Sequence, residues 1–345
     1  MTLSASYEQT NVGVSNPLQV SISSSVVLTL PMMGQFIGFS PDGSQIIISS
    51  WEIDLISTAT YQVVKTINPF GDSFGGVIAT FDSTGTQIYS VVINPYPTSG
   101  YVDSYDVSSG KRLLQSSFTN AVNLMKGSAP GSPLVVATGD PVGRQISAIG
   151  VLDPSTMNWV HSAQFPNPKS FLFSFAANPQ GDLIILWAGG RTYSYQPQTN
   201  TLLQLSISAA VLSIAFHSDG KHWLFPDESE PTIHVVDSAS NQLIGEITLP
   251  TVVNFSRHGV NAYASYLSSV LVVAPDGVNC FAVLSDNTIA WFRFDQMKFI
   301  SIIPGPATPI AIAVDPASQY LYVIDTTSES SNSNFVLWKI PVPTL

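Results

Sequence analysis

A repeated unit of four short apolar segments constrains the fold of this 345-residue chain more than any other feature. The clearest copy runs from Leu212 to Thr248. Its segments are rich in β-branched and aromatic residues, and the residues between them, such as Ser218-Asp219-Gly220, are typical of turns. The first strand is expected to end at His217. The other three are expected to span His222–Phe225, Ile233–Asp237 and Gln242–Thr248.

The same pattern opens six further units, which makes seven along the chain. Their opening segments are Phe36–Gly43, Val77–Gly85, a weaker one within Ala121–Phe165, Phe173–Gly181, Leu271–Gly277 and Ile310–Ser318. Aligned turn glycines recur at intervals of 42, 39 and 57 residues, and a 96-residue interval after Gly85 contains the degenerate third unit. Four strands per repeat at such spacing are the signature of a β-propeller. We therefore predict an all-β fold, a seven-bladed β-propeller of four-stranded antiparallel blades.

One position in the first strand of six units supports this fold. Its occupants are small or β-branched: Gly38, Thr80, Ala176, Ala215, Val272 and Ala313. The innermost strands of a propeller converge on its axis, where bulky side chains do not fit. These residues are therefore expected to face the centre of the ring.

The two ends of the chain predict how the ring closes. The last unit supplies only three strands, Pro309–Asp315, Tyr320–Asp325 and Asn334–Ile340. Near the other end, Ser25–Pro31 reads as a strand with no repeat of its own. Joining the two would complete the last blade and remove both exposed sheet edges. We predict one propeller domain over residues 25–345, preceded by a polar tail over residues 1–24.

Two segments of the fifth unit resemble a known repeat. Ile214–Lys221 (IAFHSDGK) and Ile233–Asn241 (IHVVDSASN) are similar to the VAVSPDGK and VSVIDTATN segments of the YVTN-type propeller repeat. The first, second, sixth and seventh units match one or both segments, whereas the third and fourth match poorly. The resemblance implies a relation to seven-bladed lactonases, quinoprotein-like propellers and extracellular binding proteins. No Trp-Asp dipeptide occurs, so the chain is not a typical WD40 protein.

Charge and composition narrow the possible partners. The chain has 12 basic and 23 acidic residues, a net charge of −11, and charged residues make up only 10% of it. Nucleic acids and anionic membranes need clustered basic residues, so neither is expected as a partner. A protein, glycan or cation ligand stays open, and we expect the protein to be a monomer. A surface poor in Lys and rich in Ser, Thr and Asn favours an extracellular or cell-surface location, with the cytoplasm as the alternative.

The acidic residues fall into two groups. Asp42, Asp219 and Asp276 precede turn glycines, where an aspartate bonds its own backbone, so we interpret them as structural. A second group follows the second strand of four units: Asp140, Asp227, Asp286 and Asp325. Carboxylates arranged around one opening would suit Ca²⁺. A solvated acidic rim is the simpler interpretation, so the sequence predicts no cofactor other than a possible calcium ion.

Candidate ligand-binding residues lie between second and third strands and in the Thr251–Ser268 insertion. They are Arg144, Arg191, Arg257 and His258. No histidine pair has H-x-x-x-H or H-E-x-x-H spacing and no G-x-S-x-G motif occurs, so we assign no zinc site and no catalytic residue. We predict a non-enzymatic binding propeller that uses the rim with the strand 2–3 loops. The alternative is a lactonase- or lyase-like propeller hydrolase that uses the histidine, the arginines and rim carboxylates.

Overall fold

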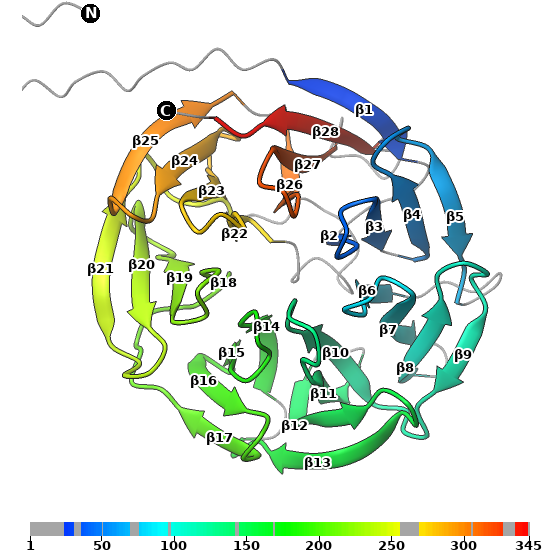
Figure 1. Cartoon of the computed structure of the whole chain (residues 1–345). Helices are drawn as coiled ribbons and strands as arrows, with labels where there is room; N and C mark the ends of the chain where they lie inside the picture. Colours follow the sequence, from blue (N-terminus) through cyan, green and yellow to red (C-terminus); the bar gives the residue numbers. More distant parts are fainter. Residues whose placement is uncertain are drawn as a thin grey trace, which may run out of the picture.

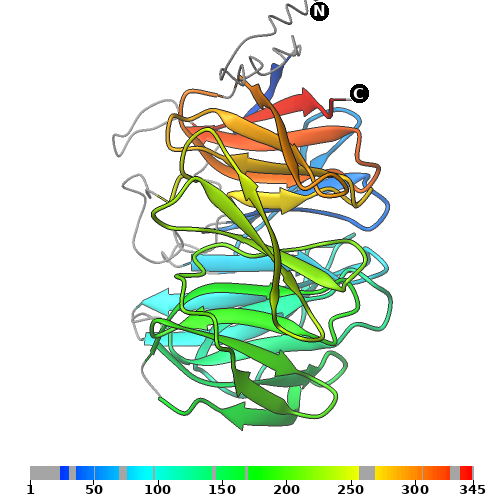
Figure 2. The same cartoon turned by 90° about the vertical axis from the view of Figure 1, so that its left-hand side faces the viewer.

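The computed structural model of the chain is all-β, and it describes residues 24–30, 36–49, 51–69, 76–95, 98–141, 145–167, 170–255, 269–304, 306–326 and 335–343. Its strands form a ring of antiparallel blades, seen along the axis in Figure 1 and from the edge in Figure 2. The innermost strand of each blade lies nearest the centre, and the outermost strand lies on the circumference. The predicted propeller fold is confirmed.

The strands of the described residues divide into sets of four, which we call blades 1 to 7 in chain order. Blade 1 contains β2 (Phe36–Phe39), β3 (Gln45–Ser49), β4 (Ile53–Ser57) and β5 (Val63–Ile67). Blade 2 contains β6 (Gly76–Phe81), β7 (Gln87–Pro95), β8 (Thr98–Asp106) and β9 (Arg112–Gln115). Blade 3 contains β10 (Ala121–Lys126), β11 (Leu134–Asp140), β12 (Gln145–Asp153) and β13 (Asn158–Gln164). Blade 4 contains β14 (Ser170–Ala177), β15 (Ile184–Ala188), β16 (Arg191–Gln196) and β17 (Thr201–Gln204).

The remaining blades follow the same order. Blade 5 contains β18 (Ala215–Phe216), β19 (His222–Pro226), β20 (Thr232–Asp237) and β21 (Leu243–Thr248). Blade 6 contains β22 (Leu271–Val273), β23 (Asn279–Val283), β24 (Ile289–Arg293) and β25 (Lys298–Ile303). Blade 7 contains β26 (Pro309–Val314), β27 (Tyr320–Thr326), β28 (Phe335–Pro341) and β1 (Ser25–Leu30). Blades 3 and 4 form one continuous sheet, because β12 also pairs with β14.

Blade 7 closes the ring as predicted. Its outermost strand is β1, which runs antiparallel to β28 with a register from Ser25 opposite Lys339 to Leu30 opposite Phe335. Figures 1 and 2 show β1 beside β28, although Leu30 and Phe335 are 305 positions apart in the sequence. The pairing covers a sheet edge that would otherwise expose unpaired backbone groups.

The turns between first and second strands confirm the alignment of the repeats. The five aligned glycines, Gly43, Gly85, Gly181, Gly220 and Gly277, all have φ between 69° and 73°. Residues with a Cβ rarely adopt this left-handed conformation, so glycine is the favoured residue there. In blade 7 the same turn uses Ser318, with a φ of 57°.

The hydrophobic core is divided among the spaces between successive blades. Between blades 5 and 6, for example, Leu224 and Val235 pack with Ala282 and Phe292. Trp223 and Trp291, which pack against blades 4 and 7 respectively, are almost fully buried. Because each blade contributes to the clusters on both of its sides, stability depends on an unbroken ring.

Candidate functional site

A pocket of about 570 Å³ lies along the innermost strands of blades 3 to 6. Its wall includes three residues of the aligned small position, Ala176, Ala215 and Val272. The small side chains that the sequence predicts near the axis therefore leave room for a ligand in the described part of the ring. The volume lies within the range of about 300–1,000 Å³ typical of ligand pockets.

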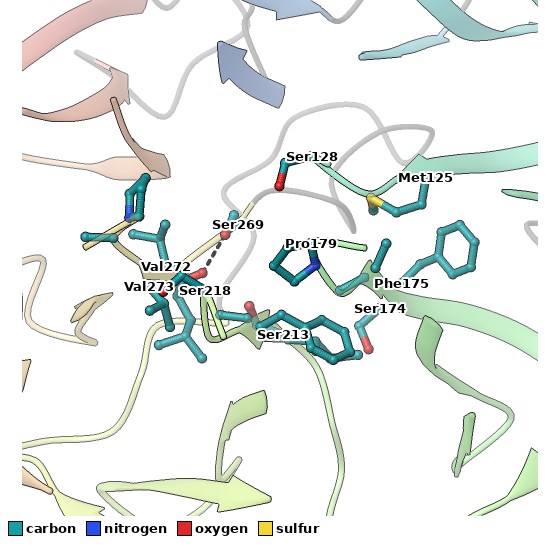
Figure 3. A pocket seen from close by; sticks show the side chains of 18 of the residues that line it. Met125, Ser128, Ser174, Phe175, Pro179, Ser213, Ser218, Ser269, Val272 and Val273 are labelled. Atoms are coloured by element: carbon teal, nitrogen blue, oxygen red, sulfur yellow. Dashed lines mark hydrogen bonds between the residues drawn. The ribbon is translucent and has the colours of Figure 1, made fainter. Parts of the chain in front are cut away.

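The pocket wall combines apolar side chains with hydroxyl groups. Figure 3 shows Ser174, Ser213 and Ser269 beside Phe175 and Val272 around the cavity. Two of these hydroxyls are already engaged, since Ser174 donates to the carbonyl of Val211 and Ser269 donates to that of Leu271. The wall therefore favours an uncharged, partly apolar ligand.

Lys126 is the one ionisable side chain among the described residues that line this pocket. Burial lowers the pKa of its ammonium group, and the negative charge of Asp82 partly opposes that shift. Its Nζ lies 3.5 Å from the carbonyl oxygen of Gly127. A single lysine supplies one hydrogen-bonding cation but no acid–base pair, so the pocket geometry suits binding better than hydrolysis.

The pocket extends along the innermost strands in both directions. Leu212 and Ser269 precede first strands and lie toward the predicted ligand rim. Ser128, Pro179, Ser218 and Pro275, all in connections between first and second strands, contribute to its wall. The predicted rim carries the strand 2–3 loops, at the opposite ends of the same strands. The sequence did not predict this pocket. Small residues are expected near the axis of any propeller, because the innermost strands converge there, whether or not they enclose a cavity.

Of the four predicted ligand-binding residues, only Arg191 lies within the described residues. Arg144, Arg257 and His258 lie outside the described residues. Arg191 begins β16, is exposed, and donates from Nη1 to Oε1 of Gln204 at 2.7 Å. Ligand binding by these four residues therefore stays a prediction.

The four predicted calcium ligands lie on four different blades. Within the described residues, none of them belongs to a group of three or more clustered metal-ligating side chains. Asp227 accepts hydrogen bonds from the backbone of Ser229 and Glu230, and Asp286 accepts from Thr288. Asp325 is buried, and Asp140, at the end of β11, is exposed. The shared calcium site therefore stays a prediction, and three of these acids have a structural role within their own blade.

The turn aspartates have the structural role that the sequence predicts. Oδ1 of Asp42 accepts hydrogen bonds from Ser40 and Ser44, and Oδ1 of Asp276 accepts from the backbone of Val278 and Asn279. In blade 5, Oδ1 of Asp219 accepts from the backbone N–H of Lys221 at 2.7 Å in the same way. These carboxylates hold the turns that begin the second strands.

Asp219 differs from the other turn aspartates because two histidines contact it. Its Oδ1 lies 2.9 Å from Nδ1 of His217, and its Oδ2 lies 2.8 Å from Nδ1 of His222. Burial acts to raise the pKa of this carboxyl, but hydrogen bonds from His217, His222 and the Lys221 backbone outweigh it and lower the pKa. We call His217, Asp219 and His222 the His–Asp–His cluster.

This cluster does not follow the histidine spacings that usually indicate a metal site. The histidines are five residues apart, a spacing absent from the helical motifs H-x-x-x-H and H-E-x-x-H. The turn at Gly220 reverses the chain and places the end of β18 beside the start of β19. A search for His-x-Asp-x-x-His across a predicted hairpin turn would have found it.

The single cysteine, Cys280, is a packing residue. Cys280 is fully buried in the cluster between blades 5 and 6, and burial raises the pKa of its thiol. A neutral buried thiol is a small hydrophobic group and a poor nucleophile.

Comparison with known proteins places the chain among β-propellers. No protein-family model matches it, and no curated protein matches it significantly. It is similar in structure to the WD40 repeats of RRP9, with 10% identity over 94% of this chain and 100% of that chain and a TM-score of 0.71. A chain of the mitotic checkpoint complex has 13% identity over 98% of this chain and 99% of that chain, with a TM-score of 0.67.

A third similar structure is the Cps50 (Swd1) β-propeller domain of Myceliophteria thermophila. It has 12% identity over 93% of this chain and 100% of that chain, with a TM-score of 0.67. Identities this low establish the propeller fold alone. The relation to YVTN-type repeats stays a prediction. The described residues also contain no helix that is long and apolar enough to cross a membrane.

Proposed function

We propose that the protein is a non-enzymatic interaction propeller that binds an extended segment of a partner protein in the central pocket of blades 3 to 6. The observation that carries this proposal is the chemistry of the pocket wall. Among its described residues, small and apolar side chains are mixed with serine hydroxyls, and one lysine is the only ionisable group. Such a wall can enclose a peptide and bond its backbone, but it holds no pair of groups for proton transfer.

The charge of the chain supports a neutral or basic partner. With a net charge of −11, its field attracts basic surfaces and repels acidic ones. The pocket itself contains little charge, so long-range attraction would act on the partner around the bound segment. Glycan ligands stay possible under the same charge argument, but the described residues of the pocket wall include no tryptophan for sugar stacking.

The hydrolase alternative has less support among the described residues. It depends on Arg257 and His258, which lie outside them, and on Arg191, which is exposed and bonded to Gln204. An extracellular or cell-surface location is a further part of the proposal. It rests on the low content of charged residues, 10% of the chain, and not on any structural feature.

Filling the pocket tests the proposal. A peptide-display library panned against the intact protein should yield sequences that bind with micromolar affinity. The Ala176→Trp variant places an indole in the pocket, and it should weaken binding of the selected peptides at least about tenfold, which equals about 1.4 kcal/mol. The matched control is Ala239→Trp, at an exposed turn outside the pocket wall, which should bind the same peptides normally.

Two results would contradict the proposal. If the selected peptides bind Ala176→Trp and the intact protein equally well, the central pocket is not the binding site. If the intact protein hydrolyses simple lactones or esters and pocket filling abolishes that turnover, the protein is an enzyme. Thermal melting of both variants confirms that each is folded before binding is compared.

A further inference from the structure

The His–Asp–His cluster is a compact set of metal-ligating atoms on the turn of blade 5. One ligand atom from each of His217, Asp219 and His222 can be chosen so that all lie within 4.8 Å of one another. No other group of three or more such side chains occurs in the described part of the chain. The cluster lies outside the pocket wall, although the intervening Ser218 belongs to that wall.

His217 is held in one orientation by the neighbouring blade. Its Nε2 lies 2.6 Å from the carbonyl oxygen of Gly277, in the equivalent turn of blade 6. Phe294 stacks on its ring, with centroids 4.0 Å apart and planes inclined by 29°. A histidine that donates from one nitrogen to a backbone carbonyl presents the other nitrogen as a ligand, which is the usual arrangement around metal ions.

The hydrogen bonds around Nδ1 of His217 show that this lone pair faces a carboxylate. The backbone N–H of Asp219 points at this nitrogen, at a distance of 3.2 Å. Oδ1 of Asp219 nevertheless lies 2.9 Å from the same nitrogen. The imidazole nitrogen and the carboxylate oxygen, both ligand atoms for transition metals, therefore lie side by side at the turn.

We propose that the His–Asp–His cluster binds a divalent transition metal ion of the zinc class, through Nδ1 of His217, the carboxylate of Asp219 and Nδ1 of His222. Two imidazole nitrogens and one carboxylate suit Zn²⁺, Ni²⁺ or Cu²⁺, whereas Ca²⁺ and Mg²⁺ prefer oxygen ligands alone. Three protein ligands leave a coordination position for water or for an atom of a bound partner.

The surroundings fit an accessible site at the surface. The side chain of His217 is 10% exposed, that of His222 is 24% exposed and that of Asp219 is 32% exposed, so an ion can reach the ligands from solvent. Asp219 still accepts the backbone bond of Lys221, which fixes the carboxylate while it binds the ion. The bonds from His217 to blade 6 would let the ion stabilise the contact between blades 5 and 6 as well as the turn.

Calorimetry with a tag-free protein tests this proposal directly. After removal of metal with EDTA, titration with ZnCl₂ should show one site per chain with micromolar or tighter affinity. His222→Gln and Asp219→Asn should each weaken Zn²⁺ at least about tenfold, since even second-shell changes cost that much. Asp219→Asn keeps an acceptor for the turn bond, and His222 is partly exposed, so both variants should fold.

The controls separate this site from general histidine binding. His161→Gln removes a histidine of β13 that lies outside the cluster, and it should leave Zn²⁺ affinity unchanged. Zn²⁺ should also raise the melting temperature of the intact protein more than MgCl₂ at equal concentration, by mass action on the folded state. Absence of Zn²⁺ binding, unchanged affinity in His222→Gln, or an equal effect of Mg²⁺ would each overturn the proposal.

Discussion

Blades 5 and 7 have the same four-stranded architecture but differ in how it is assembled. Blade 5 uses a continuous stretch from β18 to β21, whereas blade 7 takes three strands from one end of the chain and β1 from the other. The outermost strand of blade 5 is therefore joined to the strand beside it by a short turn, whereas that of blade 7 is joined to β28 by pairing and packing alone. The integrity of the whole ring thus depends most on blade 7.

The two blades also use equivalent acids in opposite ways. Asp227 and Asp325 both stand where a second strand ends or leads into its loop. Burial acts to raise the pKa of Asp227, but hydrogen bonds from Ser229, His234 and Glu230 outweigh it and lower the pKa to about 2. In Asp325 burial dominates and raises the pKa, although it accepts from Thr308 and Trp338. A repeat thus fixes the backbone position of a residue but not its environment.

The largest expected effect comes from removing the strand that closes blade 7. Deletion of residues 1–31 removes β1 and exposes the edge of β28, together with the buried face that Leu30 covers. We expect a loss of at least about 4 kcal/mol in the free energy of unfolding, or aggregation, since a typical domain has only about 5–15 kcal/mol in all. Thermal and urea denaturation measure this loss.

Two comparisons make the closure experiment decisive. Deletion of residues 1–20 leaves β1 intact and should change stability by less than about 0.5 kcal/mol. A synthetic peptide of residues 24–31, added to the longer deletion, should raise its melting temperature, whereas a scrambled peptide should not. Equal stability of the intact chain and the longer deletion would disprove the role of β1.

Truncation of the two equivalent acids should have a smaller effect, and an unequal one. Asp325→Ala leaves the backbone N–H of Thr308 and Nε1 of Trp338 without their acceptor in a partly buried place, which should cost about 2–3 kcal/mol. Asp227→Ala removes bonds to a loop that water can replace, and it should cost about 1 kcal/mol. Urea denaturation of both variants at neutral pH gives the comparison, and equal losses would contradict it.

These blades also show how far the sequence could predict the structure. The repeat, the turn glycines and the closing strand followed from local patterns, because turn residues and strand periodicity are local properties. The first strand of blade 5 is shorter than predicted, Ala215–Phe216, since Leu212–Ile214 lie against the pocket without strand pairing. The alignment correctly placed Asp227 and Asp325 at equivalent positions, but it could not show that one is accessible and the other buried.

The candidate sites were harder to predict for a related reason. The His–Asp–His cluster depends on the chain reversal at Gly220 and on support from Gly277 and Phe294 in the next blade. The pocket depends on the relative placement of four innermost strands. Contacts between blades are set by packing of the whole ring, and a single repeat does not encode them.

Asp227 and Asp325 should have opposite effects on how the free energy of unfolding changes with pH. The folded pKa of Asp227, about 2, lies below the usual 3.8, so its contribution is complete above pH 4 and is lost as the pH falls toward 2. The folded pKa of Asp325 is raised, so its ionisation opposes folding, and stability falls as the pH rises from 3.8 through that raised value.

The variants Asp227→Asn and Asp325→Asn isolate what each carboxyl contributes to the free energy of unfolding. The stability advantage of the intact protein over Asp227→Asn should shrink between pH 4 and pH 2. The advantage over Asp325→Asn should instead grow as the pH falls toward 3.8, because the protonated carboxyl no longer carries a buried charge. Urea denaturation at a series of pH values measures both differences. The same sign of change in both variants would show that the environments of the two acids do not differ in this way.

The smallest effect is expected from calcium, which tests whether the equivalent acids act together. Asp140, Asp227, Asp286 and Asp325 lie on blades 3, 5, 6 and 7, and the last three bond groups of their own blades. Since Ca²⁺ needs six to eight oxygen ligands close together, we expect CaCl₂ to raise the melting temperature no more than NaCl at the same ionic strength. A larger rise with CaCl₂ that Asp140→Asn and Asp286→Asn abolish would instead establish a shared calcium site. In that case the acids of separate blades would approach one another more closely than their local hydrogen bonds indicate.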